Sequence, residues 1–230
     1  MVNQFSRTEL LIGKEAVEKL QKAKVCVYGL GGVGSYAVEA LARAGIGHLV
    51  LIDFDKYDIT NINRQLDAKH SNIGKYKVDV MKERIIDINP TVVVEAYKPD
   101  EIESGEESVI DSSFDYVVDA IDTMSNKIKI IEKCKAENVR IITGTSAGNK
   151  LDPTKFEVAD IYKTTVCPVC KVLRKELKQR NIKDLKVVYS KEEPIKNESK
   201  EKTLGSISFV PSVMGLIMAG EVIKDIIAKS

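Results

Sequence analysis

The sequence predicts a doubly wound α/β fold, in which a mostly parallel sheet is covered by helices on both faces. Three observations support this class. Apolar strand-like runs alternate with helix-like runs over the first two thirds of the chain. These runs lack the apolar–polar alternation of a half-exposed sheet, so both of their faces must be covered. The composition is that of a globular chain, with 43% hydrophobic and 30% charged residues.

The N-terminal quarter predicts a short helix followed by a βαβ unit. The helix spans residues 8–20, and Gly13 interrupts it. From Lys24 onward a strand is expected at residues 25–28, a helix at 33–44 and a second strand at 49–52. This succession has the usual size of a βαβ unit and starts the parallel sheet.

The same alternation continues to about Gly148, where the rhythm breaks. The expected helices and strands before that point lie at residues 75–88, 92–94, 116–118, 127–136 and 139–142. Beyond it, strands are expected at 155–158, 187–189 and 206–210, with helices at 173–179 and 213–228. The charged segment 190–202 is expected to be a mobile loop. A C-terminal strand/helix extension therefore follows the doubly wound core.

The charge balance and the cysteine content exclude several classes of protein. The formal charge is +1, from 35 basic and 34 acidic residues, which argues against a coat-like nucleic-acid binder but not against a local basic patch. Four cysteines, without disulfide-dense spacing or a secretory leader, predict a reducing, cytoplasmic setting. The longest uncharged stretch, residues 203–220, is too rich in Gly, Ser and Pro for a membrane span.

A glycine-rich turn follows the first expected strand. Its glycines are Gly29, Gly31, Gly32 and Gly34, and a helix is expected directly after them. Positions without side chains let the backbone approach a phosphate and present its N–H groups at a helix N-terminus. The context therefore favours a Rossmann-like nucleotide site, while a tight strand-to-helix turn without a ligand is the alternative.

Polar residues after the second expected strand indicate polyphosphate binding. Asp53 stands where dinucleotide folds keep the carboxylate that accepts the ribose hydroxyls. An Arg fork and a Lys point charge, which a triphosphate requires, follow it in Arg64 and Lys77. Taken singly, these two cations are ordinary surface residues. The complete ordered string is Asp53, Asp55, Asn61, Arg64, Gln65 and Lys77.

Two further carboxylates, Asp119 and Asp122, follow the strand expected at 116–118. Open α/β sheets bind ligands at this end of their strands. One carboxylate there, together with phosphate oxygens, suits Mg²⁺. The alternative is that Asp122 or Ser125 caps the following helix, and both roles can coexist.

These motifs resemble the adenylation core of the ubiquitin-activating-like superfamily, which includes the ThiF and MoeB enzymes. The resemblance implies a single adenylation domain over residues 1–230, with a nucleotide-binding core at 1–150 and a substrate-facing, dimer-forming extension at 151–230. It implies that Asp53 holds the ATP ribose and that Arg64 and Lys77 bind the phosphates. It further implies that Asn61 and Gln65 line the site, that Asp122 coordinates Mg²⁺, and that a substrate carboxylate attacks the α-phosphate. Arg64, Lys77 and Asp122 are thus the expected catalytic residues.

The cysteines do not complete the zinc site that ThiF- and MoeB-like members commonly hold in two Cys-x-x-Cys pairs. This chain has one pair, Cys167 and Cys170, while Cys26 and Cys134 lie in an expected strand and helix. A closed tetrahedral zinc site is therefore short of ligands. Three interpretations of Cys167 and Cys170 remain open: two incidental thiols, a redox pair, or a thioester nucleophile.

The C-terminal third resembles the threonylcarbamoyladenosine dehydratase branch of the superfamily. The motifs are Asp152-Pro153-Thr154, Asp160-Ile161-x-Lys163-Thr164, Arg174, residues 186–194 and residues 205–210. This resemblance implies ATP-dependent activation of the threonylcarbamoyl carboxylate on tRNA, followed by ring closure with loss of water. It also implies a homodimer and possible sulfur-relay partners. An activator of a ubiquitin-like sulfur-carrier protein, and a nucleotide-binding scaffold without catalysis, are the competing hypotheses.

A local basic segment gives modest support to the hypothesis of a tRNA-modifying enzyme. Residues 171–186 carry seven basic and two acidic side chains, while residues 100–119 carry eight acids and no base. Such a patch is expected of a tRNA backbone contact, and a solvated helix face is the alternative. The tRNA-facing candidates are Arg174, Lys175, Lys178 and Arg180. The group that moves the proton in ring closure has no recognisable signal.

Overall fold

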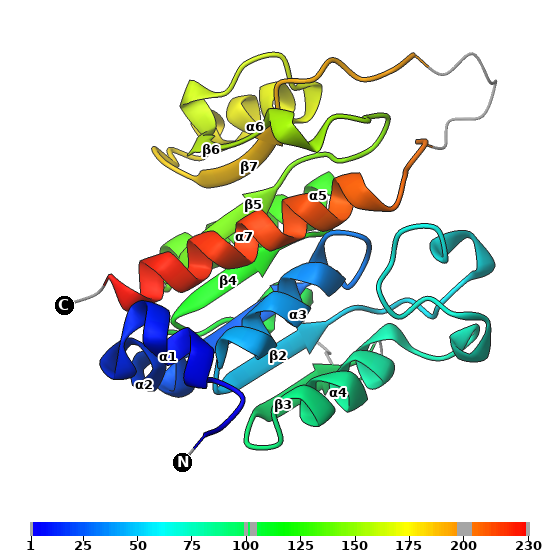
Figure 1. Cartoon of the computed structure of the whole chain (residues 1–230). Coiled ribbons are helices and arrows are strands. Elements are labelled where there is room, and N and C mark those ends of the chain that lie inside the picture. The colour runs from blue at the N-terminus through cyan, green and yellow to red at the C-terminus, as the bar shows by residue number, and fades with distance from the viewer. Residues whose placement is uncertain (1, 99–100, 102–104, 197–203, 229–230) are drawn as a thin grey trace.

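The computed structural model describes residues 2–98, 101, 105–196 and 204–228. Its centre is one sheet (Figure 1), which has seven strands. The strand order is β3-β2-β1-β4-β5-β7-β6. All neighbouring strands are parallel except β6, which pairs antiparallel with β7 at the edge. The strands are β1 Lys24–Tyr28, β2 His48–Ile52, β3 Val93–Tyr97, β4 Tyr116–Asp119, β5 Arg140–Gly144, β6 Phe156–Asp160 and β7 Lys186–Ser190.

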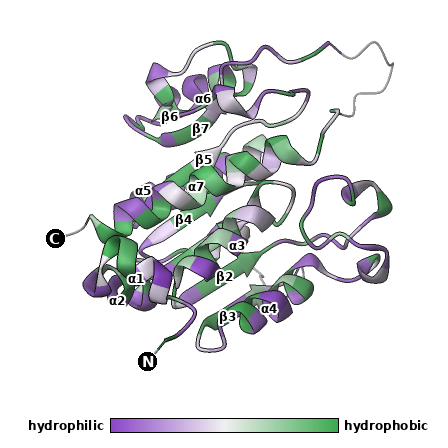
Figure 2. Cartoon of the chain, viewed as in Figure 1, coloured by the Kyte–Doolittle hydropathy of each residue, from purple (hydrophilic) through white to green (hydrophobic). Residues whose placement is uncertain are grey.

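Helices cover both faces of this sheet and form two separate hydrophobic cores. Side chains from α2, α3, α4 and α7 pack in one core, and side chains from α5 and α6 pack in the other. Apolar side chains dominate α7, which is green along much of its length in Figure 2. The helices are α1 Ser6–Ile12, α2 Lys14–Lys22, α3 Gly34–Ala44, α4 Lys77–Ile88, α5 Met124–Ala136, α6 Pro168–Gln179 and α7 Phe209–Ile227.

The predicted fold class is confirmed, and the sheet order determines where a ligand can bind. From β1 the chain proceeds outward to β2 and β3, and then returns to the other side of β1 with β4. Connections therefore leave β1 and β4 in opposite directions, which opens a crevice at the carboxyl ends of these two strands. The expected extension contributes β7 and β6, which continue the same sheet beyond β5.

The strand predicted at residues 206–210 is wrong, because α7 begins at Phe209. Val210, Met214, Met218 and Val222 are all buried in one core. This spacing of four residues follows one face of a helix and starts inside the predicted strand. Pro211 fits there because N–H groups in the first helical turn need no intrahelical acceptor.

Three other boundaries differ from the prediction. Gly13 separates two helices, α1 and α2, because its φ of +85° is foreign to a helix interior. The helix expected at 173–179 already begins at Pro168. Ser190 is a buried residue of β7, and residues 197–202 of the expected mobile loop lie outside the described residues. Among the helices described, none combines the length and apolarity needed to span a membrane.

Candidate functional site

A pocket of 520 Å³ lies at the carboxyl ends of β1, β2 and β4. The glycine turn after β1, the polar segment after β2 and the residues after β4 form most of its wall. The nucleotide-binding residues expected from the sequence that line it are Gly29, Gly31, Gly32, Asp53, Asp55, Asn61, Arg64, Gln65, Lys77 and Asp122. Segments far apart in the chain thus meet in one cavity.

The glycine turn is required by close backbone contacts as well as by any ligand. Gly29 has a φ of +83°, and a side chain on it would place Cβ 2.8 Å from the carbonyl oxygen of Ala120. A Cβ on Gly34 would lie 1.7 Å from the carbonyl oxygen of Gly29. Gly34 therefore packs the start of α3 against β1 and does not line the pocket.

Asp53 joins the glycine turn to the segment that follows β2. Its carboxylate accepts hydrogen bonds from the backbone N–H of Leu30, at 2.6 Å, and of Asp55, at 2.8 Å. Burial raises the pKa of Asp53, while the nearby Lys77 ammonium and these N–H groups oppose the rise. The carboxylate is thereby held in one orientation at the pocket wall.

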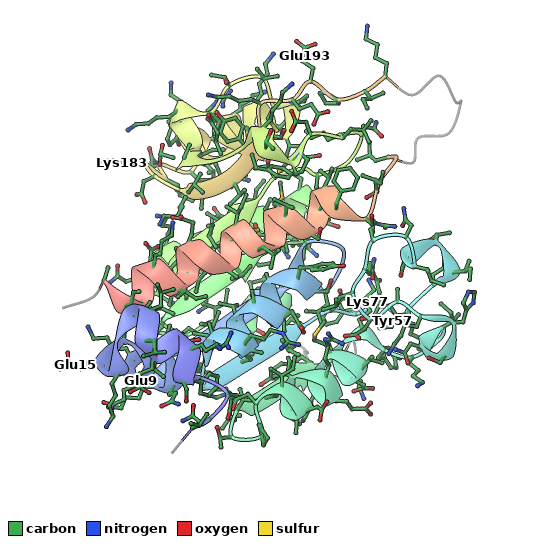
Figure 3. All side chains as sticks on the ribbon, viewed as in Figure 1. Glu9, Glu15, Tyr57, Lys77, Lys183 and Glu193 are labelled. Carbon is green, nitrogen blue, oxygen red and sulfur yellow. The ribbon has the colours of Figure 1, made fainter. Side chains whose placement is uncertain are left out.

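Lys77 brings a buried positive charge to the same place. Its side chain is 5% exposed, and its Nζ lies 2.8 Å from Asp55 Oδ2 and 3.6 Å from Asp53 Oδ2. Figure 3 shows it where α4 meets the long loop after β2. A lysine so buried needs anionic partners, and the phosphates of a nucleotide could share this ammonium with the two carboxylates.

A short 3₁₀ helix, η1 (Ile59–Asn61), positions the remaining polar residues. Asp58 and Asn61 form a reciprocal cap at its start. Arg64 follows, and its Nη1 donates to the carbonyl of Thr60 and to Asn63 Oδ1, each at 2.9 Å. These bonds hold one edge of the guanidinium at the pocket and leave the other edge for an anion.

Gln65 lines this pocket and carries a buried acceptor without a partner in the part of the chain that the structure describes. Its side chain is buried, and its Oε1 has no hydrogen-bond partner among the residues that the structure describes. A buried amide oxygen without a donor is destabilising. Because this oxygen is closed to solvent, a ligand in the pocket would bond to it only after the amide group turns.

The two carboxylates after β4 have different environments. Asp122 is exposed, lines the pocket and forms no ion pair in the described part of the chain. One free carboxylate beside a phosphate site is a donor set that suits Mg²⁺. Asp119 is fully buried instead, and both of its oxygens accept from Lys127 Nζ at 2.8 Å. Asp119 therefore supports the pocket from behind.

Lys127 was missed in the sequence, although the helix pattern contains a signal for it. Its side chain is 1% exposed, and its Nζ also donates to the carbonyl of Gly144 at 3.0 Å. Thr143 adds a hydrogen bond to Asp119 at 3.0 Å. Because Ile131 and Cys134 are four and seven residues farther along α5 and both buried, Lys127 lies on the buried face of an amphipathic helix.

Two peptide segments that carry no charged side chain also border the pocket. Residues 146–148 follow β5, and residues 204–206 precede α7. Asn149 and Gly205 exchange two hydrogen bonds, at 2.6 and 2.8 Å, and Asn63 Nδ2 donates to the carbonyl of Ser206 at 2.9 Å. The C-terminal extension thus contributes to the wall of the pocket, which the sequence did not predict.

The basic residues of α6 fall into two groups. Arg174 points into the chain, where its Nη1 donates to the carbonyl and hydroxyl of Thr164. Arg180 is exposed and pairs with Glu176 and Glu132. Lys175 and Lys178 are exposed and form no ion pair within the described ranges. Exposed cationic groups at this helix are thus mainly lysines, with Lys183 beyond its end (Figure 3).

Comparisons with known proteins agree with this geometry. The family model described as the ThiF family matches residues 5–230. The tRNA threonylcarbamoyladenosine dehydratase of Bacillus subtilis is 46% identical, over 99% of this chain and 96% of that protein. Crystal structures of the E. coli enzyme TcdA in complex with ATP and with AMP each have a TM-score of 0.88. They are 33% and 34% identical and cover 98% of this chain and 94% of theirs.

Proposed function

The chain belongs to the ThiF family, and from this premise we propose that it is an ATP-dependent tRNA threonylcarbamoyladenosine dehydratase. One observation carries the proposal: a single pocket gathers Asp53, Arg64, Lys77 and Asp122 around a glycine turn. Its two cations and its glycine backbone suit a triphosphate. The B. subtilis and E. coli relatives carry the name of this activity, and the E. coli structures hold ATP and AMP.

The proposed reaction has two steps, of the ligase type. In the first, a carboxylate oxygen of the threonylcarbamoyl group attacks the α-phosphorus of ATP, and pyrophosphate leaves. In the second, a nitrogen of the same modification attacks the activated carbonyl carbon, and AMP leaves with the former carboxylate oxygen. The tRNA has then lost the elements of one water, and the enzyme needs no covalent nucleophile.

Each pocket residue has a defined part in this proposal. Asp53 holds the ribose hydroxyls, while Arg64 and Lys77 bind the phosphates and neutralise the charge of the leaving pyrophosphate. Asn61 and Gln65 orient the nucleotide. Asp122 is the proposed Mg²⁺ ligand, and the ion would supply further charge neutralisation at the phosphates. Fixing ATP beside the carboxylate in this way lowers the entropic part of the barrier.

The macromolecular partners are also part of the proposal. The substrate is tRNA that bears threonylcarbamoyladenosine next to its anticodon, which places the reaction in the cytoplasm. Lys175 and Lys178 remain the strongest tRNA-facing candidates, because Arg174 is bonded inside the chain. A homodimer is proposed from the family, and sulfur-relay proteins are possible further partners.

The decisive experiment is mass analysis of tRNA nucleosides after incubation with the protein, ATP and Mg²⁺. We expect threonylcarbamoyladenosine to be converted to a product lighter by one water, with AMP and pyrophosphate released in equal amounts. We expect Arg64→Gln to slow this conversion about a hundredfold, because a donor to the transition-state charge is lost. Lys75→Gln, an exposed site on the same loop, is the matched control and should react normally.

Three outcomes would contradict the proposal. Equal ATP turnover with tRNA that lacks the threonylcarbamoyl group would exclude the modification as the substrate. An adenylate formed on the C-terminus of a ubiquitin-like carrier, with no change in the tRNA, would identify a sulfur-carrier activator instead. Tight ATP binding without pyrophosphate exchange would indicate a scaffold.

A further inference from the structure

The Cys167–Cys170 pair lies at the N-terminus of α6, behind the residues that follow β5. Cys167 is the N-cap residue of α6, and Cys170 lies in the first turn. Their side chains are 5% and 0% exposed. Cys167 Sγ is 3.8 Å from the hydroxyl of Thr145, which directly precedes the pocket residues 146–148. The proposed dehydratase reaction uses neither thiol.

The local geometry brings the two sulfurs together. Residues three apart in the first turn of a helix are neighbours, and Pro168 starts the helix between them with a preset φ. The hydrogen bond between the two thiols lowers the pKa of Cys167 and raises that of Cys170, and backbone N–H groups of the first turn lower the pKa of Cys167 further. The pair is therefore asymmetric, with Cys167 as the thiolate.

A buried lysine supplies a counter-charge. Lys150 is 4% exposed, and its Nζ donates to the carbonyl of Gly148 at 3.3 Å. Burial lowers the pKa of Lys150, while Cys167, Glu192 and Cys170 act in the opposite direction. Positive charge on Lys150 interacts electrostatically with both sulfurs and favours the thiolate form. The Thr164 side chain lowers the pKa of Cys170, and its hydroxyl is held by Arg174, from which it accepts, and by the carbonyl of Ile161, to which it donates.

A strained turn directly precedes α6 and ends at Cys167. Val166 has a φ of +59°, and the N–H of Cys167 donates to the carbonyl of Thr165 across it. A β-branched residue in this region of backbone space is disfavoured, and a γ-turn of this hand is rare. Val166 is 53% exposed. Opening the turn would release backbone strain directly beside Cys167.

The other two cysteines provide an internal comparison. Cys26 in β1 and Cys134 in α5 are fully buried in the same hydrophobic core, on the face covered by α5 and α6. Burial raises the pKa of both thiols, that of Cys134 to about 12. Neither lies at a helix N-terminus or beside a lysine that lowers its pKa to a reactive range. They represent inert structural thiols.

We propose that Cys167 and Cys170 form a redox-active dithiol that closes reversibly to a disulfide, with Cys167 as the attacking sulfur. The oxidant is a small-molecule disulfide. The Cys167 thiolate attacks one of its sulfurs and releases the first thiol. The Cys170 sulfur then loses its proton, attacks Cys167 and releases the second thiol. The protein loses two electrons and two protons, the small disulfide gains them, and the inference stands independently of ATP and tRNA.

The test uses the native, full-length protein and glutathione disulfide as the oxidant. Remaining thiols are blocked with N-ethylmaleimide, and the protein is digested with trypsin, which leaves both cysteines on the peptide of residues 164–171. We expect this peptide to lose two hydrogens, and to do so at least about a hundredfold faster than Cys26 or Cys134 reacts. Dithiothreitol should restore the dithiol.

Three variants separate the roles within the cluster. Cys170→Ser should trap a mixed disulfide with glutathione on Cys167, whereas Cys167→Ser should leave Cys170 unreactive. Lys150→Gln should raise the pKa of Cys167 and slow its reaction about tenfold at pH values below that pKa. Lys155→Gln, at a half-exposed lysine nearby, is the matched control and should react as the wild type does.

Several results would overturn the proposal. If the peptide keeps both thiols free at equilibrium with glutathione disulfide, the two cysteines do not form a redox pair. If Cys167 of the native protein reacts no faster than Cys26, the Cys167 thiol is not activated. A Cys167→Ser variant in which Cys170 reacts at the wild-type rate would reverse the assigned roles. Circular dichroism of each variant establishes that the comparison is made between folded proteins.

Discussion

At the scale of single residues, the Asp119–Lys127 pair is the contact that most constrains the candidate site. Both side chains are buried within the sheet and α5, and Lys127 Nζ makes three hydrogen bonds there. Burial raises the pKa of Asp119, and the Lys127 ammonium opposes this rise. The pair joins the carboxyl ends of β4 and β5, so it holds in place the residues 120–122 that border the pocket.

Removing the lysine should therefore be costly. We expect Lys127→Met to lower the free energy of unfolding by about 3–5 kcal/mol, because Asp119 is left buried without a counter-charge. Urea unfolding at pH 7 measures this change. Lys129→Met, at a 56% exposed lysine on the same helix, should change it by less than about 0.5 kcal/mol. If Lys127→Met lowers the free energy of unfolding by less than about 1 kcal/mol, Lys127 does not compensate the buried charge of Asp119.

At the scale of elements, the packing of α3 against α7 depends on one glycine. A Cβ on Gly215 of α7 would lie 2.1 Å from the carbonyl oxygen of Val33 and 3.1 Å from the backbone nitrogen of Ala37. Backbone atoms cannot move away without shifting the start of α3, which follows the glycine turn. The position of α7 is therefore fixed closely against the start of α3.

Two glycines of α7 make a matched pair for testing this contact. Gly215→Ala should lower the unfolding free energy by about 1–3 kcal/mol, because overpacking displaces the helices. Gly220→Ala should raise it by about 0.5–1 kcal/mol, because nothing lies within 4 Å of its Cβ and alanine favours the helix. Thermal unfolding of the two variants measures the difference. Equal effects of both substitutions would mean that helix propensity alone governs these positions.

A second contact between elements is sensitive to pH. Glu39 of α3 accepts from Arg84 of α4, at 2.7 and 3.1 Å, and from Arg43 at 2.7 Å. Burial raises the pKa of Glu39, but the hydrogen bonds from Arg84 and Arg43 outweigh it, so the pKa lies below its ordinary value of 4.5. The ionised Glu39 carboxylate therefore stabilises the fold fully above about pH 4.5, and this stabilisation is lost as the pH falls through the lowered pKa of Glu39.

Replacing this carboxylate should consequently matter only when it is ionised. Glu39→Gln is expected to lower the unfolding free energy by about 1–2 kcal/mol at pH 7, and by progressively less below pH 4.5. Urea unfolding from pH 3 to pH 7 follows this trend. Glu18→Gln, at a half-exposed glutamate of α2, should show little dependence. A cost that stays constant down to pH 3 would contradict the assignment.

At the scale of the whole molecule, the pocket joins parts of the chain that lie far apart. Segments after β1, β2, β4 and β5, together with residues 204–206, contribute to one wall. A ligand there binds only the folded chain, so binding must stabilise the entire fold. The near-zero net charge conceals a basic segment at residues 171–186 and an acidic one at 100–119.

ATP should therefore raise the melting temperature of the protein. At a concentration of a hundred times Kd, binding contributes about 2.7 kcal/mol. For a chain of this length we expect an increase in Tm of about 5–10 °C. Differential scanning fluorimetry with increasing ATP measures it, and Asp53→Asn should reduce the increase. An unchanged Tm at millimolar ATP would argue that the pocket binds another ligand.

Local patterns were sufficient for most of the elements and for the glycine turn and polar string of the pocket. The strands of the core are continuous apolar runs, and the glycine turn stands between one of them and a helix, so no distant contact was needed to find them. The run at residues 206–210 was misread because its apolar residues fit either period over so short a length. The helical period is visible only when Val210 is aligned with Met214 and Met218.

The sequence by itself determined the doubly wound α/β class and the string of polar residues that lines the pocket, where we propose that ATP binds. It did so because both depend on neighbours in the chain. Only the tertiary structure decided that Lys127 neutralises Asp119, that residues 204–206 border the pocket, and that Lys150 interacts electrostatically with Cys167 and Cys170. These contacts join residues on different strands and helices, whose pairing depends on how the sheet orders them.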